Sequence, residues 1–280
     1  MAAIRATLTA VTLLACVAGA EAQTASAWEA GISSHARLLA GQVPEAGGPS
    51  LFAGVEIRLE EGWKTYWRNP GDAGIPPTFD WTGSSNLAAA EALYPAPHRF
   101  ADPAGQSIGY KNSVVFPVRL SPADPGAPIQ LRLKLSYAAC ATLCVPAEAN
   151  LALTVPPALQ MPAGAIAEAL GRVPRKPVGD NDMPRVEALS VEGEGAKRRM
   201  SITVVQPPGA EETDLFIEGP SSWYLPLAEI RAKREAGAAT EIVYEVPLDE
   251  LPKSARLTGQ TLRLTLVSAA DAVEQEWTLP

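Results

Sequence analysis

The sequence predicts an all-β protein made of two successive β-sandwich domains, and three observations lead to this fold class. The chain has 280 residues, which suits one large domain or two small ones at roughly 100–200 residues per domain. Apolar residues make up 47% of the chain, and its 26 prolines and 22 glycines are typical of short strands joined by turns. Apolar and polar residues also alternate with a period of two in several segments, as in strands with one buried face.

The first 22 residues have the features of a secretory signal peptide. Arg5 supplies a positive charge near the start, Ala6–Ala18 is uncharged and largely apolar, and Ala20-Glu21-Ala22 is typical of a cleavage site before Gln23. The apolar stretch is shorter than the roughly 20 residues that a membrane-spanning helix needs. The sequence therefore predicts an exported protein with a cleaved signal peptide at residues 1–22.

Two alternatives remain open for this segment. It can stay uncut as an N-terminal anchor. Leu13-Leu14-Ala15-Cys16 is also similar to a bacterial lipoprotein signal, in which Cys16 would be lipid-anchored, although Leu14 matches that pattern poorly. If Cys16 leaves with the signal, Cys140 and Cys144 are the two cysteines of the mature chain. In an oxidising compartment, this even number favours a disulfide bond.

Period-two alternation is clearest in residues 23–156, the first predicted sandwich. In Leu51–Leu59 and in Ile129–Tyr137, every second residue is apolar, so we expect one face of each strand in a core and the other in water. Val114–Leu120 and Leu151–Val155 are further strand candidates. Turn-rich segments between these runs indicate an antiparallel sandwich.

Residues 157–184 interrupt the alternation, and we expect them to be a proline-rich connector with one short helical piece at Ala163–Leu170. Alternation returns in residues 185–280, which we predict to be a second, smaller sandwich. This second part contains no cysteine and no histidine, so we assign it no chemistry. Its strand candidates are Met200–Val204, Ile242–Val246, Leu262–Leu266 and Trp277–Leu279.

Charge and composition argue against several functions. The formal net charge is −8, the pI is about 5.0, and the longest basic run is Lys197-Arg198-Arg199. Nucleic-acid and anionic-membrane binding both need a positive surface, so neither partner is expected. Two histidines leave little room for a His-rich metal site or a Ser-His-Asp triad, and no carboxylate pair has a spacing that indicates hydrolysis.

Cys140 and Cys144 follow directly after the strand that ends at Tyr137, and they are the strongest functional signal. A bond between them would close a five-residue loop, for which chain entropy predicts only about 2 kcal/mol of stabilisation. This placement favours a bond that is made and broken. A structural disulfide is the alternative, and a soft ion such as Cu(I) is a third interpretation, to which His98 would contribute only through the fold.

Four segments together resemble the N-terminal periplasmic domain of the thiol:disulfide interchange protein DsbD family, especially its ScsB-like branch, which is related to copper-sensitivity suppressors. They are Gly62–Gly74, Tyr94–Phe100, Ile108–Lys111 and Tyr137–Glu148, and the resemblance covers about residues 30–156. It implies an immunoglobulin-like β-sandwich in the periplasm, with one redox-active cysteine pair and no cofactor. Such a domain takes electrons from a membrane-embedded thiol donor and reduces thioredoxin-like or other disulfide-containing periplasmic proteins.

Two departures from the family pattern limit this inference. Better-known members space their cysteines more widely than the three intervening residues found here. The chain also ends at Pro280 without the membrane domain and the thioredoxin-like domain of full-length members. We therefore expect the electrons to come from a separate protein.

The resemblance also suggests roles for the cysteines and for a covering segment. It favours Cys144 as the sulfur that forms mixed disulfides and Cys140 as the resolving sulfur. A cap loop with an aromatic shield is expected at Phe100–Gln106, with Phe100 as the shield. Phe100 can equally be a core residue.

Three further side chains are candidates for supporting the sulfurs. Tyr110 and Tyr137 can flank them, although Tyr137 fits equally well as the last inward residue of its strand. His98 can lower a thiol pKa if the fold brings it close, and the simpler interpretation is a hydrogen-bonded surface residue.

The sequence thus supports two hypotheses of different classes. The first is a periplasmic component of protein-disulfide reduction that exchanges thiols through Cys140 and Cys144. The second is a two-sandwich binding or chaperone-like module with a structural disulfide, connected to copper tolerance through the same resemblance. A fold alone does not choose between them.

Overall fold

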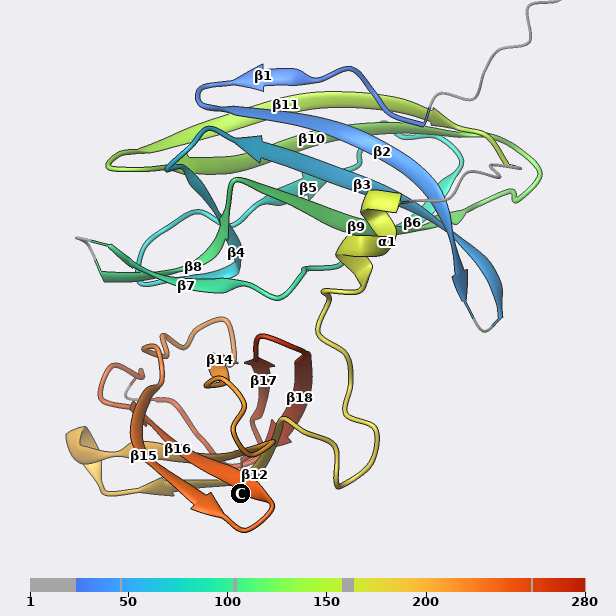
Figure 1. Ribbon diagram of the computed structural model, residues 1–280. Helices are drawn as coiled ribbons and strands as arrows, with labels where there is room; N and C mark the ends of the chain where they lie inside the picture. The colour runs from blue at the N-terminus through green and yellow to red at the C-terminus, as the bar shows by residue number, and fades with distance from the viewer. Residues whose placement is uncertain (1–23, 46, 103–104, 158–163, 253, 280) are drawn as a thin grey trace, which may run out of the picture.

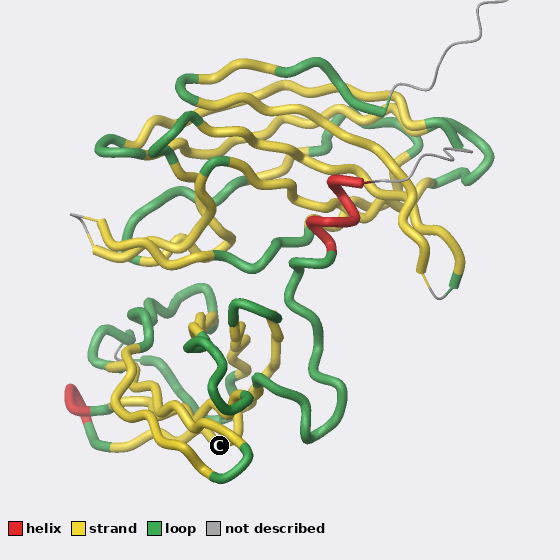
Figure 2. The backbone as a smooth tube through the Cα atoms, viewed as in Figure 1, coloured by secondary structure: helices red, strands yellow, loops and turns green. Residues whose placement is uncertain are grey.

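The computed structural model describes residues 24–45, 47–102, 105–157, 164–252 and 254–279, and it is all-β apart from one α-helix and one short 3₁₀-helix (Figure 1). The predicted signal peptide, Cys16 and residues 158–163 of the predicted connector lie outside the described residues. The all-β fold class with sandwich architecture is confirmed (Figure 2). In the described part of the chain, no helix is long and apolar enough to cross a membrane.

The first sandwich consists of two sheets packed face to face. One sheet has the order β1-β2-β3-β9-β6, and the other has the order β11-β10-β4-β8-β7 with β5 paired to β10. Neighbouring strands are antiparallel, as the alternation predicted. The strands are β1 (Glu29–Gly31), β2 (Ser34–Glu45), β3 (Gly48–Leu59), β4 (Lys64–Gly71), β5 (Thr78–Asp80), β6 (Leu87–Ala92), β7 (His98–Asp102), β8 (Gly105–Lys111), β9 (Ser113–Pro122), β10 (Ile129–Cys140) and β11 (Cys144–Val155).

The core of this sandwich lies between the two sheets. Along β10, Ile129, Leu131, Leu133 and Leu135 are buried, whereas the residues between them are exposed. Trp67 from β4 is completely buried in the same apolar cluster. The predicted alternation of β10 therefore corresponds to one face in the core and one in water.

The outer face of β3 differs from the expectation that it contacts water. Helix α1 (Gly164–Leu170) lies against this sheet (Figure 1). Phe52 is completely buried there, because Ile166 and Ala169 of the helix pack against it. A Cβ atom at Gly54 would lie 2.8 Å from the side chain of Ile166, so a glycine is needed where the helix lies against the strand. The sequence pattern of β3 could not reveal this cover, because the covering helix comes from the predicted connector.

The described part of the predicted connector forms hydrogen bonds or ion pairs with both domains. After α1, the carbonyl of Arg172 accepts a backbone hydrogen bond from Ala96 in the first domain. Three residues later, Arg175 forms a parallel bridge with Val273 and pairs its side chain with Asp182 and Asp271. This part of the predicted connector is therefore packed against the domains on both sides.

The second sandwich has a four-stranded sheet, β12-β13-β16-β15, and a three-stranded sheet, β14-β17-β18. Alternating apolar residues of both sheets form its core, as at Met200, Ile202 and Val204 of β13. The elements are β12 (Arg185–Glu192), a 3₁₀-helix (Gly195–Lys197), β13 (Arg199–Gln206), β14 (Asp214–Glu218), β15 (Glu229–Ala236), β16 (Ala239–Pro247), β17 (Thr261–Val267) and β18 (Ala272–Thr278).

The two sandwiches share an interface that is partly apolar and partly charged. Phe216 of β14 is completely buried in the apolar cluster of the first domain, with its ring 5.7 Å from that of Trp67. Beside it, Arg68 of β4 forms a two-pronged ion pair with Glu218 and a further pair with Glu274. Burial alone lowers the pKa of Arg68, but these two carboxylates raise it overall, so the guanidinium stays charged at the interface.

Candidate functional site

A long antiparallel hairpin carries the two cysteines. Strands β10 and β11 are paired along their full length, from Ile129 opposite Val155 to Cys140 opposite Cys144. The two sulfurs are bonded, and the Cα atoms of the two cysteines are 4.1 Å apart. The disulfide therefore closes the turn of a hairpin that backbone hydrogen bonds already hold together, and it ties no distant strands.

The two sulfurs differ sharply in their access to solvent. Cys140 is 0% exposed and forms a small buried cluster with Tyr66 and Ala138. Cys144 is exposed, and its neighbour Leu143 in the turn is 76% exposed. Because thiol–disulfide exchange depends on access to a sulfur, a partner can reach Cys144 directly, whereas Cys140 is shielded.

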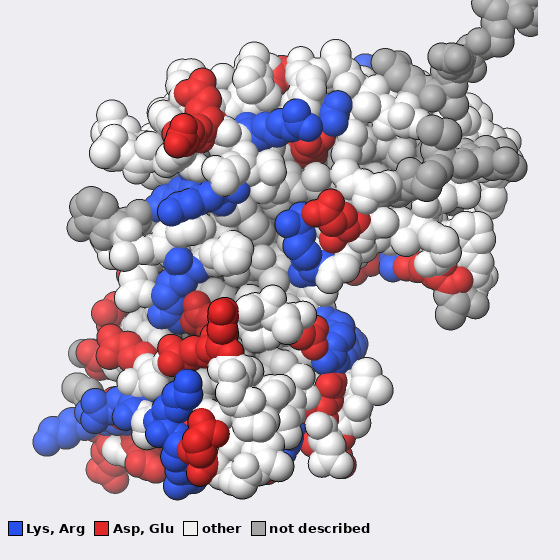
Figure 3. Space-filling view, viewed as in Figure 1, with Lys and Arg blue, Asp and Glu red and all other residues white. Residues whose placement is uncertain are grey.

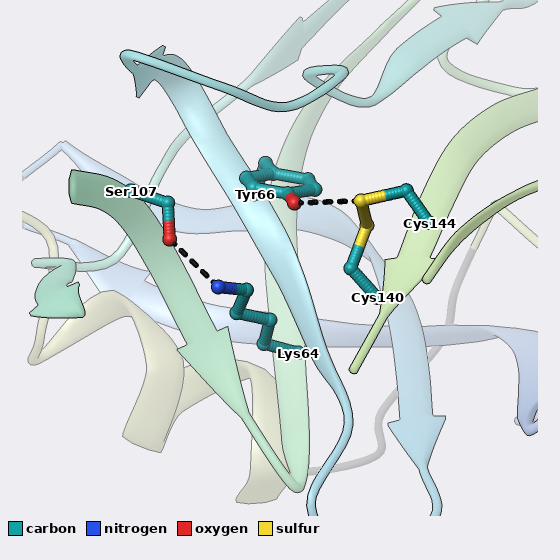
Figure 4. Close-up of a disulfide and its surroundings, with 5 residues drawn as sticks. All are labelled: Lys64, Tyr66, Ser107, Cys140 and Cys144. Atoms are coloured by element: carbon teal, nitrogen blue, oxygen red, sulfur yellow. Dashed lines mark hydrogen bonds between the residues drawn. A yellow bond between two sulfur atoms is a disulfide. The ribbon is translucent and has the colours of Figure 1, made fainter. Parts of the chain in front are cut away.

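Tyr66 of β4 lies against the disulfide, as Figure 4 shows. Its hydroxyl donates a hydrogen bond to the Cys144 sulfur over 3.3 Å, and its side chain is 2% exposed. Gly74 holds the other side of the ring. It has a φ of +143°, and a Cβ atom there would lie 2.3 Å from the ring. The ring is thus fixed between the cysteine hairpin and the segment that follows β4.

Lys64 lies two residues before Tyr66 on the same face of β4, and its Cα is paired with that of Cys140. Its ammonium group is directed away from the disulfide and donates a 2.9 Å hydrogen bond to the hydroxyl of Ser107 (Figure 4). Although charged, the residue is only 6% exposed. A buried ammonium on the strand beside Cys140 favours negative charge nearby, as on a thiolate.

Phe100, the predicted shield, is half-buried on β7, where it pairs with Ser107 in the β7–β8 hairpin. The ammonium groups of Lys111 and Lys64 lie 4.7 and 5.8 Å from the centre of its ring. The hairpin occupies the predicted cap segment Phe100–Gln106, of which residues 103–104 lie outside the described part. Phe100 thus covers Lys64, which in turn lies beside Cys140.

The other predicted supporting residues lie apart from the sulfur contacts. His98 is exposed on β7, with its ring 6.4 Å from that of Phe100. Tyr110 is in the main core, where its hydroxyl donates to the carbonyl of Pro95 and burial raises its pKa well above the usual value. Tyr137 is also in the main core as the last inward residue of the β10 alternation. Its hydroxyl is bonded to that of Ser34, and burial raises its pKa as well.

Sequence reasoning missed two residues of the site. They are Tyr66 and Lys64, which lie in the segment Gly62–Gly74 and have no individual role in the sequence analysis. The available signal was the spacing Lys64-Thr65-Tyr66, which puts both side chains on one face of a strand. Nothing in the sequence of β4 indicates that β10 lies beside it.

The donor set for a metal ion is small. Among the described residues, no group of three or more His, Cys, Asp and Glu side chains is close enough to hold one.

This arrangement defines a tandem β-sandwich protein with a disulfide at the tip of a hairpin and one sulfur open to solvent. Residues 43–156 match the family described as "Thiol:disulfide interchange protein DsbD, N-terminal", so the first domain is a DsbD N-terminal domain. Residues 172–280 match a family described as a domain of unknown function (DUF8393). No curated protein matches the chain.

A solved structure is similar to nearly the whole chain. The crystal structure of the N-terminal periplasmic domain of ScsB from Proteus mirabilis is 20% identical, with a TM-score of 0.69, and the match covers 91% of this chain and 98% of that one. Its fold is therefore the fold of this chain. A structure of manganese lipoxygenase of Gaeumannomyces graminis with part of zonadhesin of Komagataella pastoris is 8% identical, covers 86% and 93% of the two chains, and has a TM-score of only 0.17.

Proposed function

We propose that this protein is a periplasmic thiol–disulfide exchange component, which takes electrons from a membrane-embedded thiol donor and passes them to oxidised periplasmic proteins. The unequal exposure of the two bonded sulfurs carries this proposal. Cys144 is open to a partner, whereas Cys140 is fully buried within the same five-residue loop. The DsbD N-terminal match and the ScsB-like fold support the same chemistry and compartment.

Reduction of a partner takes two exchange steps in this proposal. The Cys144 thiolate attacks one sulfur of the partner's disulfide, so a Cys144–partner bond forms and the partner's second sulfur leaves as a thiolate. Cys140 then attacks the Cys144 sulfur, which re-forms the intramolecular bond and releases the partner's first sulfur. Two electrons pass to the partner, and its two thiolates take up the two protons that the cysteines lose.

The residues around the pair support these steps. A hydrogen bond from Tyr66 stabilises Cys144 more strongly as a thiolate than as a disulfide sulfur, because charged acceptors form stronger bonds. The buried ammonium of Lys64 favours the thiolate of the adjacent Cys140. The exposed side chain of Leu143 offers an apolar contact to a partner beside the attacking sulfur.

A trapping experiment in the exporting cell tests the proposal. Cys140→Ala removes the resolving sulfur, so a mixed disulfide between Cys144 and its partner should accumulate. This species should appear on a nonreducing gel as a slower band that collapses with reductant. The wild type should contain little of it, because Cys140 resolves the bond intramolecularly at high effective concentration.

Cys144→Ala is the matched control, because the sulfur that remains is buried and should trap much less partner. A purely structural disulfide predicts something else: both variants lose up to about 2 kcal/mol of stability and neither traps a partner. A stability loss without a partner band in either variant would therefore exclude the exchange function.

A further inference from the structure

Two contacts connect the second domain to the segments around the disulfide. In Figure 1, the β7–β8 hairpin lies on the side of the first domain that faces β14. On the face drawn in Figure 3, acidic and basic side chains are intermingled, most densely over the second domain. Polar contacts across the domain boundary reach Arg99 of this hairpin and Asp72 of the segment that follows β4.

The first contact is made by Arg99 of β7. Its guanidinium forms a two-pronged ion pair with Asp214 over 2.6 and 3.1 Å, and it also donates to the carbonyl of Ala228. Successive residues of a strand point to opposite faces, so Phe100, next in the chain, points away from Arg99 and covers Lys64. The second domain therefore holds β7 in place through Arg99. On the opposite face of the same strand, Phe100 covers Lys64, the neighbour of Cys140.

The second contact is made by Tyr224, which lies between β14 and β15. Its hydroxyl donates to one carboxylate oxygen of Asp72 over 2.8 Å, and the other oxygen accepts the backbone N–H of Gln106 at the start of β8 over 2.7 Å. Asp72 lies two residues before Gly74, which packs on the ring of Tyr66. The second domain thus also holds the segment that keeps Tyr66 against Cys144.

We propose that the second domain is a positioning element of the redox site. Through Asp214 and Tyr224, it keeps the β7–β8 hairpin and the segment 72–77 closed over Lys64 and Tyr66, and so maintains the shielding of Cys140. This inference rests on the proposed function only for its consequence in thiol exchange, because the shielding itself is a property of the structure.

The test uses the full chain in a Cys144→Ala background, so that Cys140 is the one remaining cysteine among the described residues. Asp214→Asn and Tyr224→Phe are combined, since both preserve side-chain shape and lie in the second domain. Loss of the two contacts should lower the free energy of opening the hairpin by about 1 kcal/mol. Alkylation of Cys140 by iodoacetamide should therefore become about three- to tenfold faster. Peptide mass spectrometry measures the rate at Cys140 itself.

Asp271→Asn is the matched control. It removes an ion pair to Arg175 that joins the connector to the second domain and does not touch the hairpin, so the Cys140 rate should stay the same. Hydrogen exchange separates local opening from global destabilisation: amides of β8 should exchange faster in the double variant, whereas those of β3 should not. Equal Cys140 rates in the double variant and its background, or equal acceleration at β3, would overturn the proposal.

A second measurement probes positioning and uses the protein with both cysteines. Reduction by two glutathione molecules gives the dithiol and one glutathione disulfide, a transfer of two electrons. A looser hydrogen bond from Tyr66 should destabilise the reduced pair, so the equilibrium constant for reduction should fall about two- to threefold in the double variant. An unchanged constant would contradict the positioning role. Neither readout needs a partner protein, so partner trapping can fail while this inference stands.

Discussion

The hydroxyl of Tyr66 is the polar group that the structure places on the exposed sulfur. In the disulfide it donates to a weak acceptor, and after reduction it would donate to a thiolate, which accepts far more strongly. A side chain that is only 2% exposed and held by Gly74 cannot easily turn away from the sulfur. Tyr66 is therefore expected to tune the reactivity of Cys144.

Tyr66→Phe should raise the thiol pKa of Cys144 in the reduced protein, because the thiolate loses a hydrogen-bond donor. Near neutral pH, alkylation of Cys144 should then slow several-fold. The measurement is the pH profile of alkylation in a Cys140→Ala background. Tyr110→Phe is the control, because it removes a buried hydroxyl that bonds Pro95 and touches neither sulfur. Identical profiles for the two variants would exclude this role for Tyr66.

Sequence reasoning found the cysteines but only part of their surroundings, and the reason is physical. Cys140 and Cys144 are four residues apart after a clear strand pattern, so their proximity is local. Tyr66 reaches Cys144 across a separation of 78 residues. Such a contact depends on which strands become neighbours, and the alternation of a single strand does not encode this.

At the scale of elements, the β7–β8 hairpin places the ring of Phe100 5.8 Å from the ammonium group of the buried Lys64, and we expect it to shield the cysteines. Phe100→Ala should leave the fold intact, since Phe100 is only half-buried and lies outside the main apolar cluster. Lys64 would become more exposed, and reagents should reach the reduced cysteines faster. The rate of alkylation of the reduced protein measures this effect.

Val178→Ala offers a control for Phe100→Ala, because it shortens an 81% exposed side chain of the connector. Its alkylation rate should equal that of the wild type. If Phe100→Ala gives the same rate too, Phe100 does not shield the cysteines.

The strands with clear alternation were predicted near their observed positions, and those without it were not. Strand β4 reads Lys-Thr-Tyr-Trp at its start, and all four residues are buried, so no alternation is visible. Strand β15 is exposed along its full length and also lacks the pattern. Alternation of apolar and polar residues marks strands that have one face in the core and one in water. It is absent where both faces of a strand are buried or both are exposed.

At the scale of the whole molecule, the domain interface contains a group that titrates in alkaline solution. The hydrogen bond to Asp72 raises the pKa of Tyr224 from 10.0 to about 12. In the unfolded chain, this tyrosine ionises near its ordinary pKa of about 10. Its contribution to stability is therefore fully present below that pH and is lost as the pH rises through about 12.

This linkage predicts how the wild type compares with Tyr224→Phe, which cannot ionise. The free energy of unfolding of the wild type, relative to the variant, should be constant from pH 8 to about 10 and should then fall. Urea unfolding at a series of pH values measures the difference, in which other alkaline titrations largely cancel. A difference that stays level above pH 10 would mean that the bond to Asp72 does not hold in solution.

The packing of helix α1 has a practical consequence for where the first domain can be cut. The family match of the first domain ends at residue 156, before the helix that covers Phe52 and Val115. A fragment cut at that boundary would present this apolar patch to solvent, and it would also lack Phe216 in its core cluster. Such a fragment should aggregate when it is expressed, and extending it through Arg172 should improve its solubility. The segment that folds cleanly is thus expected to be longer than the segment that the family model matches, because it includes the helix that covers Phe52.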